Sequence, residues 1–134
     1  MLTSLIILLL LVIIALVVFY KQKDDVINHI DDVPINKMDQ YSYQTPEITT
    51  DLKDGSFVRI QFQLVTNSKQ AQKEIVQREF QLKNILIKEL AKMEEDDFKA
   101  NLAQLENILV DKINEVMEKG QVLKVFTTNK ILQN

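Results

Sequence analysis

The chain of 134 residues contains no cysteine, no tryptophan, one histidine and only two glycines. Without cysteine it has no disulfide framework, thiol nucleophile, zinc knuckle or lipoprotein-type cysteine anchor. Phosphate loops and dinucleotide fingerprints need several glycines close together. Gly55 and Gly120 are the only glycines and lie far apart in the sequence, so both motifs are excluded. The lone His29 lies in a polar stretch without a serine or cysteine nucleophile motif, which favours a surface histidine. We therefore expect no catalytic residue, no cofactor and no small-molecule substrate.

An excess of positive charge is also absent. Residues 47–134 carry 13 basic and 14 acidic side chains, and the two signs are interspersed. Such a surface offers no basic footprint that could release counterions from a phosphate backbone, so the sequence argues against nucleic acid as a partner.

The most distinctive feature present is an apolar run, LIILLLLVIIALVVF, over residues 5–19. Extended to Leu2 and Tyr20, it gives a helix about 28 Å long at ~1.5 Å per residue, close to the thickness of a bilayer core. A cleaved signal peptide would have a basic start and an A-x-A-like exit, and a core helix would have a polar face. Neither is found, so residues 1–20 are predicted to be a transmembrane anchor. The residues expected to span the membrane are Leu5, Ile6, Leu9, Val12, Ile13, Leu16, Val17 and Phe19.

Residues 21–46 are predicted to be a polar, acidic linker with Pro34 and Pro46 as breakers and three lysines against five aspartates. A short helix over residues 26–30, or folding on contact with a partner, remains open. Lys21 and Lys23 follow the anchor and nothing basic precedes it, which by the positive-inside rule alone places the rest of the chain in the cytoplasm.

Residues 47–134 are expected to form the folded domain. From Phe57 onward apolar and polar residues alternate, so Val58, Ile60, Phe62 and Leu64 should face a core. The Asp54-Gly55 turn before this strand indicates a hairpin with a short partner strand in EITTDL, residues 47–52.

Helical patterns occupy the middle of this domain. A cap at Asn67 or Ser68 precedes a helical stretch whose apolar spacing drifts near Phe80, so we predict a kink or a break there that gives two helices in sequence. Residues 94–100 are read as an acidic connector rather than a metal site, because adjacent carboxylates radiate in different directions.

A second amphipathic helix follows this connector. Asn101 and Gln104 resemble a capping box, and the apolar stripe runs from Leu102 to Met117. Gly120 suits a left-handed cap, and residues 121–133 read as a closing strand. The fold class is therefore α+β, with helices packed on a small sheet.

Several phrases of the chain, taken in order behind one anchor, are similar to a known family. They are PEITTDLKDGSFVRIQFQL, FQLKNILIKEL, KINEVMEKGQVLKV and the glutamine at position 133. Together they resemble FliL, the flagellar basal-body-associated family, in its Gram-positive form. Two departures are the lack of basic residues before the anchor and the polar Thr127–Lys130 segment, which leaves pairing of the last strand open.

The resemblance implies a single-pass protein of the cell membrane with a short cytoplasmic N-terminus. It implies an extracytoplasmic domain similar to the stomatin/prohibitin-homology (SPFH) core and association with the basal body and with stator units of the MotA/MotB type. It also implies a homo-oligomeric ring that supports stator recruitment, stability or torque in swimming and swarming, without enzymatic activity. Arg59, Gln61 and Gln63 on the polar strand face are candidate protein contacts, or merely solvated. The alternative is a general membrane-anchored, stomatin-like scaffold with no flagellar role.

Overall fold

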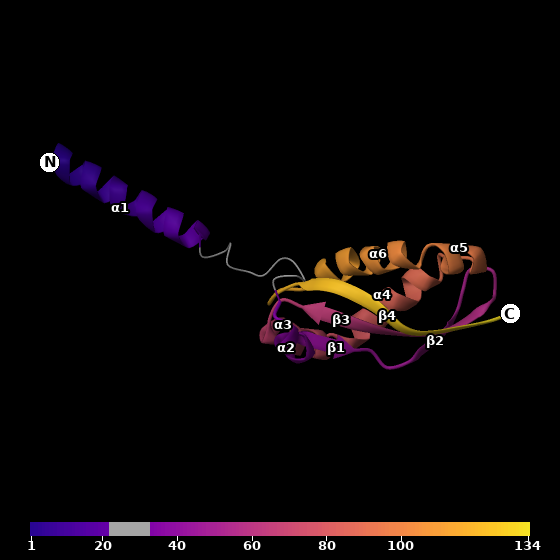
Figure 1. Cartoon of the computed structure of the whole chain (residues 1–134). Helices are drawn as coiled ribbons and strands as arrows, with labels where there is room; N and C mark the ends of the chain where they lie inside the picture. The colour runs from indigo at the N-terminus through magenta and orange to yellow at the C-terminus, as the bar shows by residue number, and fades with distance from the viewer. Residues whose placement is uncertain (22–32) are drawn as a thin grey trace.

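The computed structural model describes residues 1–21 and 33–134. It contains one long N-terminal helix, α1, and an α+β domain, as Figure 1 shows. The elements are α1 (Leu2–Lys21), α2 (Ile35–Tyr41), β1 (Ser42–Gln44), β2 (Ile48–Asp51), β3 (Phe57–Thr66), α3 (Lys69–Gln77), α4 (Glu79–Leu90), α5 (Glu95–Ala100), α6 (Leu102–Asn114) and β4 (Val122–Gln133). The predicted helix over residues 26–30 and His29 fall outside the described residues.

Strand β3 is the centre of the antiparallel sheet. β4 pairs with it along its whole length, so the polar Thr127–Lys130 segment is paired after all. On the other side of β3, β2 pairs with its first half and β1 with its last residues. The register of β4 shifts near Phe62 and again near Thr66, where β4 carries one extra residue each time. Such bulges increase the local twist of the sheet.

One face of the sheet carries the hydrophobic core. The predicted inward residues Val58, Ile60, Phe62 and Leu64 are all fully buried, which confirms the alternation. α3, α4 and α6 pack on this face, and α4 and α6 run alongside the two long strands (Figure 1). Their buried residues include Ile75, Leu82, Leu86, Leu90, Leu105, Leu109 and Ile113.

The predicted break in the first helical stretch is confirmed. Ser68 caps α3 by accepting a hydrogen bond from the backbone N–H of Ala71 at 3.1 Å. α3 ends at Gln77, and α4 begins at Glu79, directly after Arg78. After this break, Phe80 is exposed, whereas Leu82 and Leu86 point into the core and are buried.

Two expectations for helix ends are wrong. The capping box lies at Glu94 and Asp97, where it starts α5 in the predicted connector, whereas the side chain of Asn101 makes no capping bond. α6 ends at Asn114, so Gly120 is not its cap. Gly120 is needed for space, because a Cβ there would lie 2.6 Å from the Cβ of Ala71.

The folded domain starts earlier than residue 47. Residues 35–44, expected to be linker, form α2 and β1. The backbone of Ser42, Tyr43 and Gln44 pairs with β3, and Thr66 Oγ1 donates a hydrogen bond to the carbonyl of Tyr41 at 2.6 Å. These contacts are made by backbone and hydroxyl groups, which leave no hydrophobic signal in the sequence.

Candidate functional site

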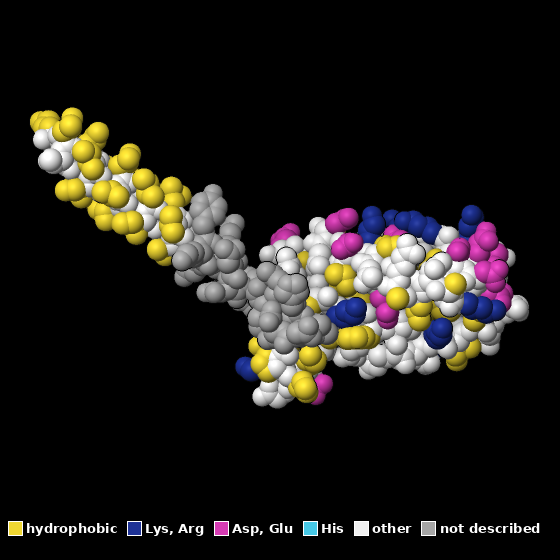
Figure 2. Space-filling view, turned by 45° about the horizontal axis from the view of Figure 1, so that its top comes forward, with side chains coloured by type: hydrophobic (Ala, Val, Ile, Leu, Met, Phe, Trp, Pro, Cys, Tyr) yellow, Lys and Arg dark blue, Asp and Glu magenta, His cyan; other side chains and the backbone are white. Residues whose placement is uncertain are grey.

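The first candidate region is α1. Each of its predicted membrane-spanning residues from Leu5 to Phe19 is exposed, and Figure 2 shows apolar side chains along the whole visible face of the helix. The stretch Leu2–Phe19 is long and apolar enough to cross a bilayer. A helix that is apolar on every side and packs on nothing is suited to lipid rather than water.

The second candidate region is the sheet face opposite the core, which we call the open face. Its β3 residues are Phe57, Arg59, Gln61 and Gln63, which alternate with the buried residues. Arg59 is exposed and lies between Thr49 of β2 and Ile131 of β4 in the register. No ion pair to Arg59 is found among the described residues. This guanidinium is therefore available to a partner.

Three exposed apolar side chains also belong to the open face. Phe57 is 54% exposed, Phe126 41% and Ile131 42%. The alternation in the sequence places Phe57 on this face. Phe126 and Ile131 can be placed on it only from the register of β4, which the sequence does not reveal. The cavity beside Phe57, Arg59 and Ile131 has a volume of only about 20 Å³. It is too small for a small-molecule ligand, since such sites measure roughly 300–1,000 Å³.

The two predicted contact glutamines differ from Arg59. The Gln61 side-chain nitrogen donates a hydrogen bond to the carbonyl of Thr45 at 2.9 Å. Gln63 is half-buried between Gln44 and Phe126 in the register. Gln61 thus holds the segment between β1 and β2 against the sheet, and Arg59 is the more accessible contact group.

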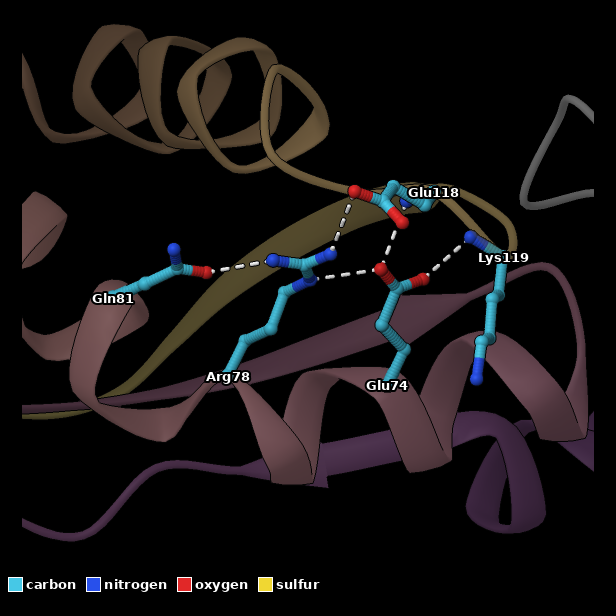
Figure 3. A network of polar contacts seen from close by, with 5 residues as sticks. All are labelled: Glu74, Arg78, Gln81, Glu118 and Lys119. Atoms are coloured by element: carbon cyan, nitrogen blue, oxygen red, sulfur yellow. Dashed lines mark hydrogen bonds and ion pairs between the residues drawn. The ribbon is translucent and has the colours of Figure 1, made fainter.

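A buried charge lies elsewhere, on α3, and sequence reasoning missed it. Glu74 is only 3% exposed, and its carboxylate accepts hydrogen bonds from Arg78 Nε and from the backbone N–H groups of Glu118 and Lys119 (Figure 3). Burial acts to raise the pKa of Glu74, but these donors outweigh burial, so the pKa lies below its ordinary value. The carboxylate fastens the α6–β4 connection to α3, which is a structural task.

Together, the apolar helix and the domain behind it define a class: a single-pass membrane protein that carries a small α+β domain. Among the described residues no group of three or more His, Cys, Asp or Glu side chains is placed to hold a metal ion.

Comparison of the sequence with known protein families and proteins identifies the family within this class. Residues 42–133 match the family described as "Flagellar basal body-associated protein FliL". A relative from Bacillus subtilis (strain 168), "Flagellar protein FliL", is 31% identical over 114 residues, which cover 84% of this chain and 78% of the relative. The chain belongs to the FliL family, which confirms the resemblance and supports a flagellar role.

Proposed function

We propose that this protein acts beside the stator units of the flagellar motor and supports their recruitment, stability or torque output. Its membership of a flagellar family supports this proposal, and so does the apolar helix, which is long enough to anchor the domain in the membrane in which stator units of the MotA/MotB type operate. The observation that carries it is the open face, where Arg59 forms no ion pair with any residue that the structure describes and lies among exposed Phe57 and Ile131. Aromatic and arginine side chains are the groups most enriched at protein interfaces.

The proposal includes an extracytoplasmic domain that packs side by side with its copies in a ring. Anchoring in one membrane raises the effective concentration and fixes the orientation of neighbouring domains, so weak contacts suffice. Helices on one face of a small antiparallel sheet are compatible with an SPFH-like core, which remains a prediction.

Placement of the domain is tested by thiol labelling, since the chain has no cysteine of its own. Gln70 on α3 is exposed, so Gln70→Cys should react with a membrane-impermeant maleimide in intact cells. Labelling only after the cells are permeabilised would place the domain in the cytoplasm and contradict the proposal.

The function is tested by swimming and swarming assays in a clean deletion strain with filaments counted. The deletion should leave filaments in place but reduce motility, and wild type should restore it. Arg59→Glu should fail to restore it, whereas Lys88→Glu, the same charge change at an exposed site of α4, should restore it fully.

Fluorescently labelled stator units give the second readout. Their number at the motors should fall in the deletion strain and in the Arg59→Glu strain, but not in the Lys88→Glu strain. Unchanged motility and stator occupancy in the deletion strain would instead favour a general membrane-anchored scaffold.

A further inference from the structure

A cavity of about 230 Å³ opens among the end of α4, the short α5 and the first half of α6. It lies at the α5 end of the domain, away from α2 and α3 (Figure 1). Its polar lining comes from Glu89, Lys92, Asp97, Asn101 and Gln104, and Met93 and Leu105 contribute apolar surface. At this volume, below the roughly 300–1,000 Å³ typical of small-molecule sites, the cavity suits a single long side chain.

Glu89 gives the cavity its chemistry. Its side chain is only 10% exposed, and its Oε1 accepts a hydrogen bond from Lys92 Nζ at 2.8 Å. Contacts among the described residues use only this oxygen, and no buried side-chain oxygen among them lacks a partner. The second carboxylate oxygen of Glu89 therefore remains accessible, and the cavity is the space that Glu89 lines. A donor that enters the cavity can therefore reach this oxygen and form a charge-assisted hydrogen bond with it.

Acceptors outnumber cations in this lining. The lining residues include the carboxylates of Glu89 and Asp97, the side-chain amides of Asn101 and Gln104, and one ammonium, that of Lys92. One oxygen of Asp97 already accepts the backbone N–H of Glu94 in the capping box of α5. Lys92 is itself 65% exposed, so it can swing out of the cavity when a better cation enters. Further acidic side chains gather at the α5 end of the surface (Figure 2), where they attract cations from a distance.

We infer that this cavity binds an arginine side chain of a partner polypeptide. A guanidinium presents five donors in a planar fork, which suits several acceptors at different angles better than a point charge does. The apolar stem of arginine would lie along Met93 and Leu105. Lys92 acts as an internal competitor that occupies Glu89 until the partner's arginine displaces it.

The test is a titration of the full chain in detergent micelles, with its methionine methyl groups labelled with carbon-13 for NMR. Met93 lines the cavity, whereas Met38 and Met117 lie outside it and serve as references. The probe is N-acetyl-arginine methylamide, and its matched control is N-acetyl-citrulline methylamide, which has the same shape without the charge. The arginine probe should shift the Met93 signal saturably and leave Met38 and Met117 in place, and the citrulline probe should not shift Met93.

Variants give effects of opposite sign. Glu89→Gln should lower the affinity for the arginine probe about tenfold, which corresponds to the loss of one charge-assisted hydrogen bond. Asp111→Asn, on the exposed surface of α6, should leave this affinity unchanged. Lys92→Gln should tighten binding severalfold because the competitor is gone, and Lys112→Gln, with the same charge change outside the cavity, should not. Equal shifts from both probes, or unchanged affinity in Glu89→Gln and Lys92→Gln, would overturn the inference.

Discussion

The carboxylate of Glu74 on α3 accepts the backbone N–H of Lys119, with 2.6 Å between Glu74 Oε2 and the Lys119 nitrogen. Its other oxygen accepts the N–H of Glu118 and Arg78 Nε, both at 2.8 Å. A buried anion is stable only when donors replace its lost water. Here the donors are Arg78, which directly follows α3, and two backbone N–H groups of the α6–β4 connection. Glu74 therefore helps to fix the α6–β4 connection, together with Asn114, whose side chain bonds to both the backbone N–H and the carbonyl of Val122 at the start of β4. β4 in turn pairs with the whole of β3 and so shapes the open face.

Glu74→Gln is predicted to lower the free energy of unfolding by about 1–3 kcal/mol. The amide keeps one acceptor oxygen, but its NH₂ group faces donors and its negative charge is gone. Urea unfolding of the full chain in a non-ionic detergent, followed by far-UV circular dichroism, measures this change.

The matched control for this change is Glu118→Gln. Its side chain is 79% exposed and pairs with Arg78 only at the surface, so the loss should stay below ~0.5 kcal/mol. Equal stability of the two variants would mean that Glu74 does not hold the connection.

Because the pKa of Glu74 is lowered in the folded protein, the free energy of unfolding should depend on pH in the acid range. Its folded-state pKa lies below the ordinary value of 4.5, so the unfolded chain takes up the proton first as pH falls. The contribution of Glu74 is therefore complete above about pH 4.5 and is lost as pH falls through the folded-state pKa. The gap in unfolding free energy between wild type and Glu74→Gln should narrow below about pH 4.5. A gap that stays constant down to about pH 3 would contradict this assignment.

The two glycines should respond differently to asparagine. Gly55 has φ +86° with no atom within 4 Å of an added Cβ, and asparagine adopts such left-handed conformations readily, so Gly55→Asn should cost less than ~1 kcal/mol. At Gly120 a Cβ would lie 2.6 Å from Ala71 Cβ and 2.7 Å from Asn67 Oδ1. Gly120→Asn should therefore cost about 1–3 kcal/mol or more, as overpacking does. Thermal or urea unfolding ranks the two variants, and the reverse order would rule out close approach as the role of Gly120.

How far the sequence predicts this fold depends on which groups make each contact. The alternation around Phe62 predicted the central strand and its buried face, because a half-buried strand leaves a period of two. The drift near Phe80 likewise predicted the helix break. Both signals come from hydrophobic side chains.

Contacts made by polar and backbone groups left no such signal. β1 consists of three residues that pair through their backbone, so its side chains give no strand pattern. From the sequence, Glu74 is indistinguishable from a solvated glutamate, because its partner Lys119 lies far along the chain. The open face was predicted in part: alternation placed Arg59 and Gln61 on it, but the bond from Gln61 to Thr45 depends on tertiary placement. The cavity beside Glu89 is formed by residues of α4, α5 and α6 and of the turns between them, so no local pattern in the sequence predicts it.

The anchor makes a separate prediction about α1. Leu9 and Ile13 are one turn apart on the same side of the helix, near its middle, and both are exposed. An arginine near the centre of a membrane helix costs ~2.5–3.5 kcal/mol, so Leu9→Arg combined with Ile13→Arg should release the protein from membranes washed with alkaline carbonate. The control Leu9→Ile with Ile13→Leu preserves the apolar character and should stay in the membrane pellet. Retention of the double arginine variant in that pellet would mean that contacts other than lipid hold the chain at the membrane.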